Sequence, residues 1–186
     1  SAQLHFDLAE YDKADADYRL MLEHNEADQV AMIGLARNML MRKDYQATIN
    51  MTNTCEKIDS SYDEVYRFRM QAYDKLGETD KAIDDAIKYY DKAENPDVSL
   101  INSIFKKHIS YALALVKNMI SKSEDSRKWK MLLTTIYELD YDYVNAIKEY
   151  NRIEREYGAT PAIHYYRSYC YNELGDSENA IKDITK

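Results

Sequence analysis

Apolar residues recur along the chain at the three- and four-residue spacing of one helix face, in stretches separated by short polar turns. The stretches come in pairs. Only 4 Gly and 2 Pro interrupt 186 residues, which favours helices joined by short turns over a sheet with many tight turns. The pattern predicts an all-α protein with helices over residues 29–42, 45–58, 63–76, 79–93, 127–140, 143–157, 161–174 and 177–186.

One helix pair is repeated along the sequence. The segment YDKLGETDKAIDDAI at 73–87 returns as YNELGDSENAIKDIT at 171–185, with Tyr, Leu-Gly, Ala-Ile and Asp at the same spacing. The period is 34 residues when the anchors Ala82, Ala146 and Ala180, with Tyr73, Tyr137 and Tyr171 before them, are aligned. It divides residues 1–186 into a single array of units at about 1–28 (partial), 29–62, 63–96, 97–126 (irregular), 127–160 and 161–186 (partial).

The recurring residues resemble the tetratricopeptide repeat (TPR), in which Trp, Leu-Gly, Tyr, Ala, Phe and Pro recur over 34 residues. The matching residues are Tyr66, Tyr73, Leu76, Gly77, Ala82 and Ala86; Leu133, Tyr137, Tyr143, Ala146 and Tyr150; and Tyr171, Leu174, Gly175 and Ala180. The resemblance implies a right-handed superhelical solenoid of stacked antiparallel helix pairs, with about five to six repeats. The recurring alanines then have a structural role, in packing against aromatic rings.

The unit at 97–126 departs from this pattern. It has 30 residues and neither Gly nor Pro at its turn. Its apolar residues fit one continuous helix, which would kink the stack, as well as they fit two helices over 99–122. We favour two helices, because Tyr111 and Ala114 have the spacing of Tyr143 and Ala146 in a regular second helix.

Two Arg–Asp pairs share a spacing of sixteen residues. Arg69 is followed by Asp85, and Arg167 by Asp183. An unpaired buried charge would cost on the order of several kcal/mol, so an Arg in a core slot needs a carboxylate opposite it. The spacing therefore predicts that each Arg faces its Asp across the helix pair. We interpret both pairs as structural, and a catalytic role is a poor alternative.

The other units hold different residues in these two slots. The unit that begins at 29 has Leu35 and Met51, so that an apolar residue accompanies an apolar one. The unit that begins at 127 has Leu133 with Glu149, which weakens the rule.

The chain contains no recognisable reaction centre. The histidines stand at His5, His24, His108 and His164, and they lack the spacing that metal ligation needs. The glycines stand alone at turns, so no phosphate-binding loop is present. Cys55 and Cys170 lie too far apart along a linear stack to form a disulfide, and we expect both to be reduced and packed. We therefore expect a protein that is not an enzyme and that needs no cofactor or metal.

The charge balance limits the partners. The formal net charge is −8 and the pI is about 5.1, which disfavours nucleic acid because an acidic protein repels phosphate backbones. No apolar run is long enough to span a bilayer and no leader is present, so we expect no membrane insertion. A cytoplasmic location is favoured.

The resemblance places the first helix of each pair along a concave groove. The candidate binding residues on these helices are Arg37, Arg67, Gln71, Asp74, Lys128, Met131, Thr135, Tyr165, Tyr169 and Asn172. Arg, Tyr and Met are residue types that are frequent at binding hot spots. Relatives that hold the carboxylate tails of chaperones have Lys and Asn four residues apart on this stripe. Arg67 and Gln71 share the spacing but not the identities, which favours an ordinary polar groove.

The favoured function is a protein-interaction scaffold that binds a peptide or protein segment in the groove. One alternative is a regulatory or targeting domain of a larger enzyme; another is a module that binds carbohydrate or a small molecule at Tyr165 and Tyr169. Repeat arrays are normally capped by polar helices, and neither end of this sequence supplies one. We therefore expect a segment of a longer array or of a multidomain protein, with self-association through the uncapped ends.

Overall fold

The computed structural model describes residues 1–8 and 10–185, and all regular structure in this part of the chain is helical. Its helices follow one another as six consecutive pairs, which confirms the predicted all-α arrangement. The chain divides into two compact units, Ser1–Ile104 (unit 1) and Phe105–Lys186 (unit 2). Lys186, the last residue of the helix expected at 177–186, lies outside the described residues.

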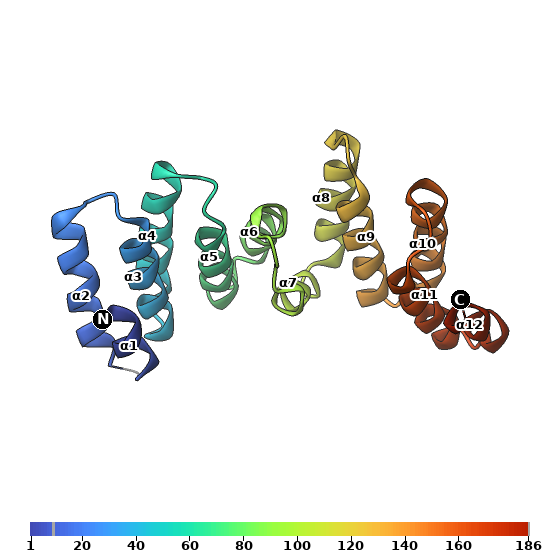
Figure 1. The fold of residues 1–186 in the computed structure, drawn as a ribbon, viewed down its shortest axis with the longest axis horizontal. Helices are drawn as coiled ribbons and strands as arrows, with labels where there is room; N and C mark the ends of the chain where they lie inside the picture. The colour runs from blue at the N-terminus through green and yellow to red at the C-terminus, as the bar shows by residue number, and fades with distance from the viewer. Residues whose placement is uncertain (9, 186) are drawn as a thin grey trace. The chain divides into compact units, whose positions relative to one another are not determined.

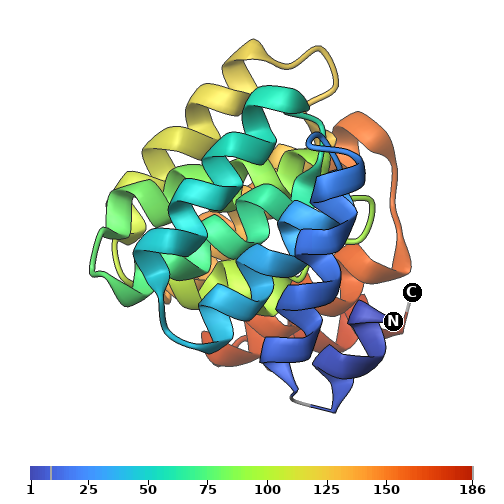
Figure 2. The same cartoon turned by 90° about the vertical axis from the view of Figure 1, so that its left-hand side faces the viewer.

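Unit 1 contains the first three helix pairs and most of a further helix. Its elements are α1 (Ala2–Asp7), α2 (Tyr11–His24), α3 (Gln29–Met41), α4 (Tyr45–Ile58), α5 (Asp63–Lys75), α6 (Thr79–Lys92) and α7 (Val98–Phe105), whose last residue belongs to unit 2. From α1 to α6 each helix packs on the next, and α2, α3 and α4 lie side by side in both views (Figures 1 and 2). The first helices also touch one another, α1 with α3 and α3 with α5.

Unit 2 continues with the same kind of packing. Its helices are α8 (Ile109–Lys122), α9 (Arg127–Leu139), α10 (Tyr143–Tyr157), α11 (Pro161–Glu173) and α12 (Ser177–Ile184), each in contact with the next. The eight predicted helices all begin at the predicted residue and end within two residues of the predicted end. The irregular segment forms two helices, because α7 ends at Phe105 and α8 begins at Ile109. The favoured interpretation of 99–122 is confirmed, and the continuous helix is wrong.

The turn inside each regular pair depends on one residue with a left-handed backbone. Its φ angle is 64° at Lys43, 77° at Gly77, 59° at Tyr141 and 76° at Gly175. Glycine adopts this conformation without strain, whereas Lys and Tyr do not. In three of the turns the next residue is an Asp whose carboxylate accepts an N–H from the first turn of the following helix, at Asp44, Asp142 and Asp176.

Small residues let neighbouring helices approach closely. Ala82, Ala146 and Ala180 are all buried. Gly34 on α3 lies against the ring of Tyr18, and a Cβ added there would come within 2.2 Å of the Tyr18 Cζ atom. Among the described residues, one core cluster in unit 1 is built around Ala14, Tyr18, Ala31 and Leu35, and one in unit 2 around Ala146, Tyr150, Ile153 and Ile163.

Candidate functional site

The first helices of unit 1 form the surface on which the sequence places its candidate binding residues. Because α3 touches both α1 and α5, the first helices of this unit are neighbours. We call this the first-helix surface of unit 1. It carries Arg37 on α3, and Arg67, Gln71 and Asp74 on α5, all of them half-buried.

Arg37 is largely engaged inside the fold. Its guanidinium carbon lies 3.5 Å from the centroid of the Phe6 ring, a cation–π contact. Its Nη2 atom donates hydrogen bonds to Gln3 Oε1 at 2.9 Å and to Tyr18 Oη at 3.2 Å. Arg37 therefore ties α1 and α2 to α3 through its Nη2 group, whereas its buried Nε has no hydrogen-bond partner among the described residues.

Arg67 is more available than Arg37. Its Nη1 atom donates to the two carboxylate oxygens of Glu64 at 3.1 and 3.3 Å, and its side chain is 37 % exposed. The Gln71 amide donates to the Arg67 carbonyl oxygen at 2.9 Å, which holds both residues on one stripe of α5. A partly exposed ion pair of this kind contributes about 0.2–1 kcal/mol.

The candidates on α9 in unit 2 are less uniform. Met131 is half-buried and packs against the core cluster of the unit. The Thr135 hydroxyl donates to the Met131 carbonyl oxygen at 3.2 Å, which is a bond within the helix. Lys128 is exposed and its Nζ lies 5.0 Å from the centroid of the buried Trp129 ring.

The candidates on α11 are brought together at a pocket. Tyr165, Tyr169 and Asn172 line a cavity of about 460 Å³ between α11 and α12. The Tyr169 ring also meets the ring of Tyr143 edge-on, with centroids 6.1 Å apart. Tyr side chains combine a large apolar surface with a hydroxyl that stays in water, which suits a binding surface.

The Arg–Asp pairs lie in the helix interfaces, where all four side chains are buried. Arg69 Nε is 2.7 Å from Asp85 Oδ2, and Arg69 Nη2 is 2.9 Å from Asp85 Oδ1. The remaining Nη1 atom donates to Glu56 at 2.5 Å and to Asn53 at 2.6 Å, both on α4. Arg69 on α5 therefore joins its own partner helix α6 to the preceding pair.

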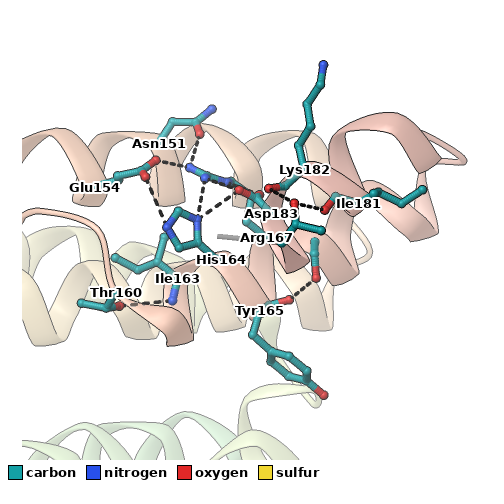
Figure 3. Close-up of polar contacts among 12 residues, drawn as sticks. Asn151, Glu154, Thr160, Ile163, His164, Tyr165, Arg167, Ile181, Lys182 and Asp183 are labelled. Carbon is teal, nitrogen blue, oxygen red and sulfur yellow. Dashed lines mark hydrogen bonds and ion pairs between the residues drawn. The ribbon is translucent and has the colours of Figure 1, made fainter.

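The same set of contacts recurs in unit 2, as Figure 3 shows. Arg167 donates to both carboxylate oxygens of Asp183 at 2.6 Å, to Asn151 at 2.7 Å and to Glu154 at 2.5 Å. His164 adds a contact, because its Nδ1 atom lies 3.1 Å from Asp183 Oδ1. The sequence predicted the Arg–Asp contacts but not the Asn and Glu partners. The signal was present, since Asn and Glu stand sixteen and thirteen residues before each Arg.

The pKa values of Asp85 and Asp183 are shifted in opposite directions. Burial raises the pKa of Asp85 and outweighs the effect of Arg69. Burial also acts to raise the pKa of Asp183, but the hydrogen bonds and charges of Arg167 and His164 hold it below its ordinary value. The additional His164 contact favours the charged form of Asp183, as expected for a hydrogen bond to a carboxylate.

The unit that begins at 127, where Leu133 and Glu149 occupy the equivalent positions, lacks this network. Leu133 is buried, and Glu149 Oε2 is buried without a hydrogen-bond partner among the described residues. Elsewhere in unit 2, Glu138 accepts a hydrogen bond from the Tyr150 hydroxyl at 2.7 Å and lies 3.5 Å from Cys170 Sγ. Burial raises the pKa of Glu138.

The remaining candidates for chemistry are packing residues. Cys55 and Cys170 are buried and free, and burial raises their thiol pKa values to about 11 and about 12, which makes them poor nucleophiles at neutral pH. Over residues 1–8 and 10–185, no group of three His, Cys, Asp or Glu side chains is placed to hold a metal ion. In the same residues no helix has the length and apolar character needed to cross a bilayer.

Comparison with known proteins identifies the fold. No family model and no curated protein matches the sequence. The structure is similar to that of YrrB, described as a TPR protein with an unusual peptide-binding site, with a TM-score of 0.50 and 14 % identity over 90 % of this chain and 89 % of that one. It is also similar to a tetratricopeptide repeat protein from Parabacteroides merdae, with a TM-score of 0.52 and 14 % identity over 99 % of this chain and 75 % of that one.

A third similar structure is a chain of the Naa15/Naa10 complex bound to HypK-THB. It matches with a TM-score of 0.57 and 13 % identity over 100 % of this chain, which spans 30 % of that one. At these identities the likeness shows the fold alone. The chain has the fold of tetratricopeptide repeat proteins.

Proposed function

We propose that this protein is a TPR-type scaffold that binds a peptide or protein segment of a partner on its first helices. The observation that supports the proposal is the contact of α1 with α3 and of α3 with α5, because it makes the first helices of three helix pairs neighbours in unit 1. An extended segment can cross such a row of helices and meet one helix after another.

Arg67 and Gln71 are the residues best suited to this role on unit 1. The guanidinium of Arg67 is partly exposed, and its ion pair with Glu64 is easily exchanged for a ligand carboxylate. On unit 2, Tyr165 and Tyr169 are exposed and offer apolar contact. The ligand that fits the surface of unit 1 is a peptide with at least one acidic side chain.

Selection from a random peptide library on the wild-type protein tests the proposal. Selected peptides should bind with micromolar affinity by calorimetry and should bind Arg67→Glu about tenfold more weakly, because one hot-spot side chain contributes more than about 1 kcal/mol. Arg19→Glu is the matched control, since Arg19 is an exposed arginine on the second helix α2. Peptides that bind Arg67→Glu and Tyr169→Ala as tightly as the wild type would contradict the proposal.

A further inference from the structure

Three tyrosine rings of unit 2 are in contact in a row. Tyr141 lies in the turn between α9 and α10, Tyr143 at the start of α10 and Tyr169 on α11, and we call them the tyrosine row. The rings of Tyr141 and Tyr143 meet edge-on with centroids 6.3 Å apart, and those of Tyr143 and Tyr169 with centroids 6.1 Å apart. Tyr143 is buried, whereas Tyr141 is 77 % exposed and Tyr169 is 48 % exposed. The row therefore presents two exposed rings that are both held by contact with one buried ring.

Tyr141 occupies a position at which glycine suits the backbone. Its φ angle is 59°, and the equivalent turns of the units that begin at 63 and 161 have Gly77 and Gly175 there. The left-handed conformation is unfavourable for tyrosine, and the ring gains little burial in return because it is largely exposed. A strained residue that the core does not hold in place is a candidate for a role in function.

Other tyrosine rings of the chain show which kind of group such a ring attracts in this protein. Among the described residues, Lys and Arg side chains lie 5.0–5.8 Å from the ring centroids of Tyr66, Tyr73, Tyr137 and Tyr157. The negative face of an aromatic ring attracts a cation electrostatically. In the same part of the chain, no Lys or Arg makes such a contact with the tyrosine row. Its exposed rings are therefore available to a cation from another molecule.

The charges near the row also favour a cation. The row lies within the stretches 131–147 and 168–181, neither of which contains Lys or Arg. The charged residues of these stretches are all acidic, at Glu138, Asp140, Asp142, Glu173, Asp176 and Glu178. The Tyr143 hydroxyl donates to Glu173 Oε2 at 3.5 Å, which places one of these carboxylates beside the row. Charge complementarity therefore selects a positively charged ligand.

Arginine is the cation that suits both the rings and the carboxylates. Its guanidinium is planar, so it stacks on a ring while its N–H groups reach an acceptor beside the ring. Arg127 combines these contacts inside unit 2, because its Cζ lies 5.0 Å from the Tyr157 ring centroid and its Nη2 donates to the Tyr157 carbonyl oxygen at 2.9 Å. We propose that the tyrosine row binds arginine side chains of a partner protein, with each guanidinium packed on an exposed ring. This interaction goes beyond the proposed function, because it selects a basic ligand and needs nothing from Arg67.

A short arginine peptide is the probe for this proposal. It has the sequence GSRGRSGS, and a matched peptide has glutamine in place of both arginines. NMR titration of isotope-labelled protein at low ionic strength measures the dissociation constant of each peptide. Tyr141→Gly removes one exposed ring and supplies the residue that suits the turn, so the variant keeps its fold and its charge. Tyr166→Ala is the matched control, because Tyr166 is an exposed tyrosine of α11 whose ring meets Tyr165.

Tyr141→Gly should bind the arginine peptide about threefold to fivefold more weakly than the wild type, which is the effect of one exposed cation–π contact. The double variant Tyr141→Gly/Tyr169→Ala should bind it at least about tenfold more weakly. Tyr166→Ala should bind it as the wild type does, and Arg67→Glu should bind it no more weakly. Glu173→Gln should weaken binding more than Glu26→Gln, which removes an exposed carboxylate of unit 1. The glutamine peptide should bind the wild type at least about tenfold more weakly than the arginine peptide.

Three results would overturn the proposal: no saturable binding to the wild type, equal binding of the arginine and glutamine peptides, or equal binding to the wild type and to Tyr141→Gly/Tyr169→Ala. Sedimentation of the protein alone tests another occupant. If the wild type dimerises and Tyr141→Gly is monomeric, the row contacts a second copy of this chain, and the assignment to a partner protein is wrong. A negative result leaves the role of Arg67 intact, because that role is measured with library-selected peptides and Arg67→Glu.

Discussion

The Arg69–Asp85 pair allows a quantitative test of how the repeat is stabilised. The two side chains are 5 % and 4 % exposed and share two hydrogen bonds. In Asp85→Ala, the Nε and Nη2 groups of Arg69 lose their acceptors, while Nη1 keeps Glu56 and Asn53. Removal of one partner of a buried ion pair costs about 3–5 kcal/mol. We expect the lower end, about 3 kcal/mol, because Glu56 still compensates the charge.

Urea unfolding followed by circular dichroism measures this loss in the free energy of unfolding. In thermal unfolding of a chain of this length, a loss of about 3 kcal/mol corresponds to a fall of roughly 6–12 °C in Tm. Peptide binding should be unchanged, because Asp85 lies in the interface between α5 and α6. If Asp85→Ala is as stable as the wild type, or if it is stable but loses peptide binding, the structural role of the pair is refuted.

The unit that begins at 29 supplies a control from the chain itself. Its equivalent slots hold Leu35, which is buried, and Met51, which packs against the same core cluster. The double variant Arg69→Leu/Asp85→Met copies this solution. It should recover stability to within about 1 kcal/mol of the wild type, because an apolar pair can replace a buried ion pair at little cost. A double variant no more stable than Asp85→Ala would show that the slots are not equivalent.

Three further predictions concern buried groups and turns. Glu138→Gln should raise the urea midpoint at pH 7, because the folded-state pKa of Glu138 is raised. The wild type therefore loses stability as pH rises above the unfolded-state pKa, and this loss is complete above the folded-state pKa. The gain from Glu138→Gln should disappear below about pH 4, where the carboxyl group is protonated in both states. Lys43→Gly should stabilise the protein by about 0.5–1 kcal/mol through relief of its left-handed backbone, and Gly77→Lys should destabilise it by a similar amount in the same urea titration. Cys55 and Cys170 should react with a thiol reagent only as fast as the protein opens, so a burst of reaction in native buffer would contradict their burial.

The sequence by itself determined the helices, their pairing and the Arg–Asp contacts. Periodicity along one chain fixes which face of a helix is apolar, and residues such as Asp44 and Pro161 mark where helices begin. The recurrence of Arg69 with Asp85 in a second unit revealed a contact across a helix pair because both residues changed together. Repetition inside one chain thus supplied information that a single copy of the unit does not contain.

Only the tertiary structure decided how successive pairs are joined and which surfaces are shared. The partners of Arg69 on the preceding helix, Asn53 and Glu56, depend on how far a guanidinium reaches across the next interface. The contacts of Glu138 with Tyr150 and Cys170 likewise depend on how closely α9, α10 and α11 pack. Hydrophobic periodicity gives the direction of a side chain on its own helix but not the distance to its neighbours, which is why these contacts required the packed structure.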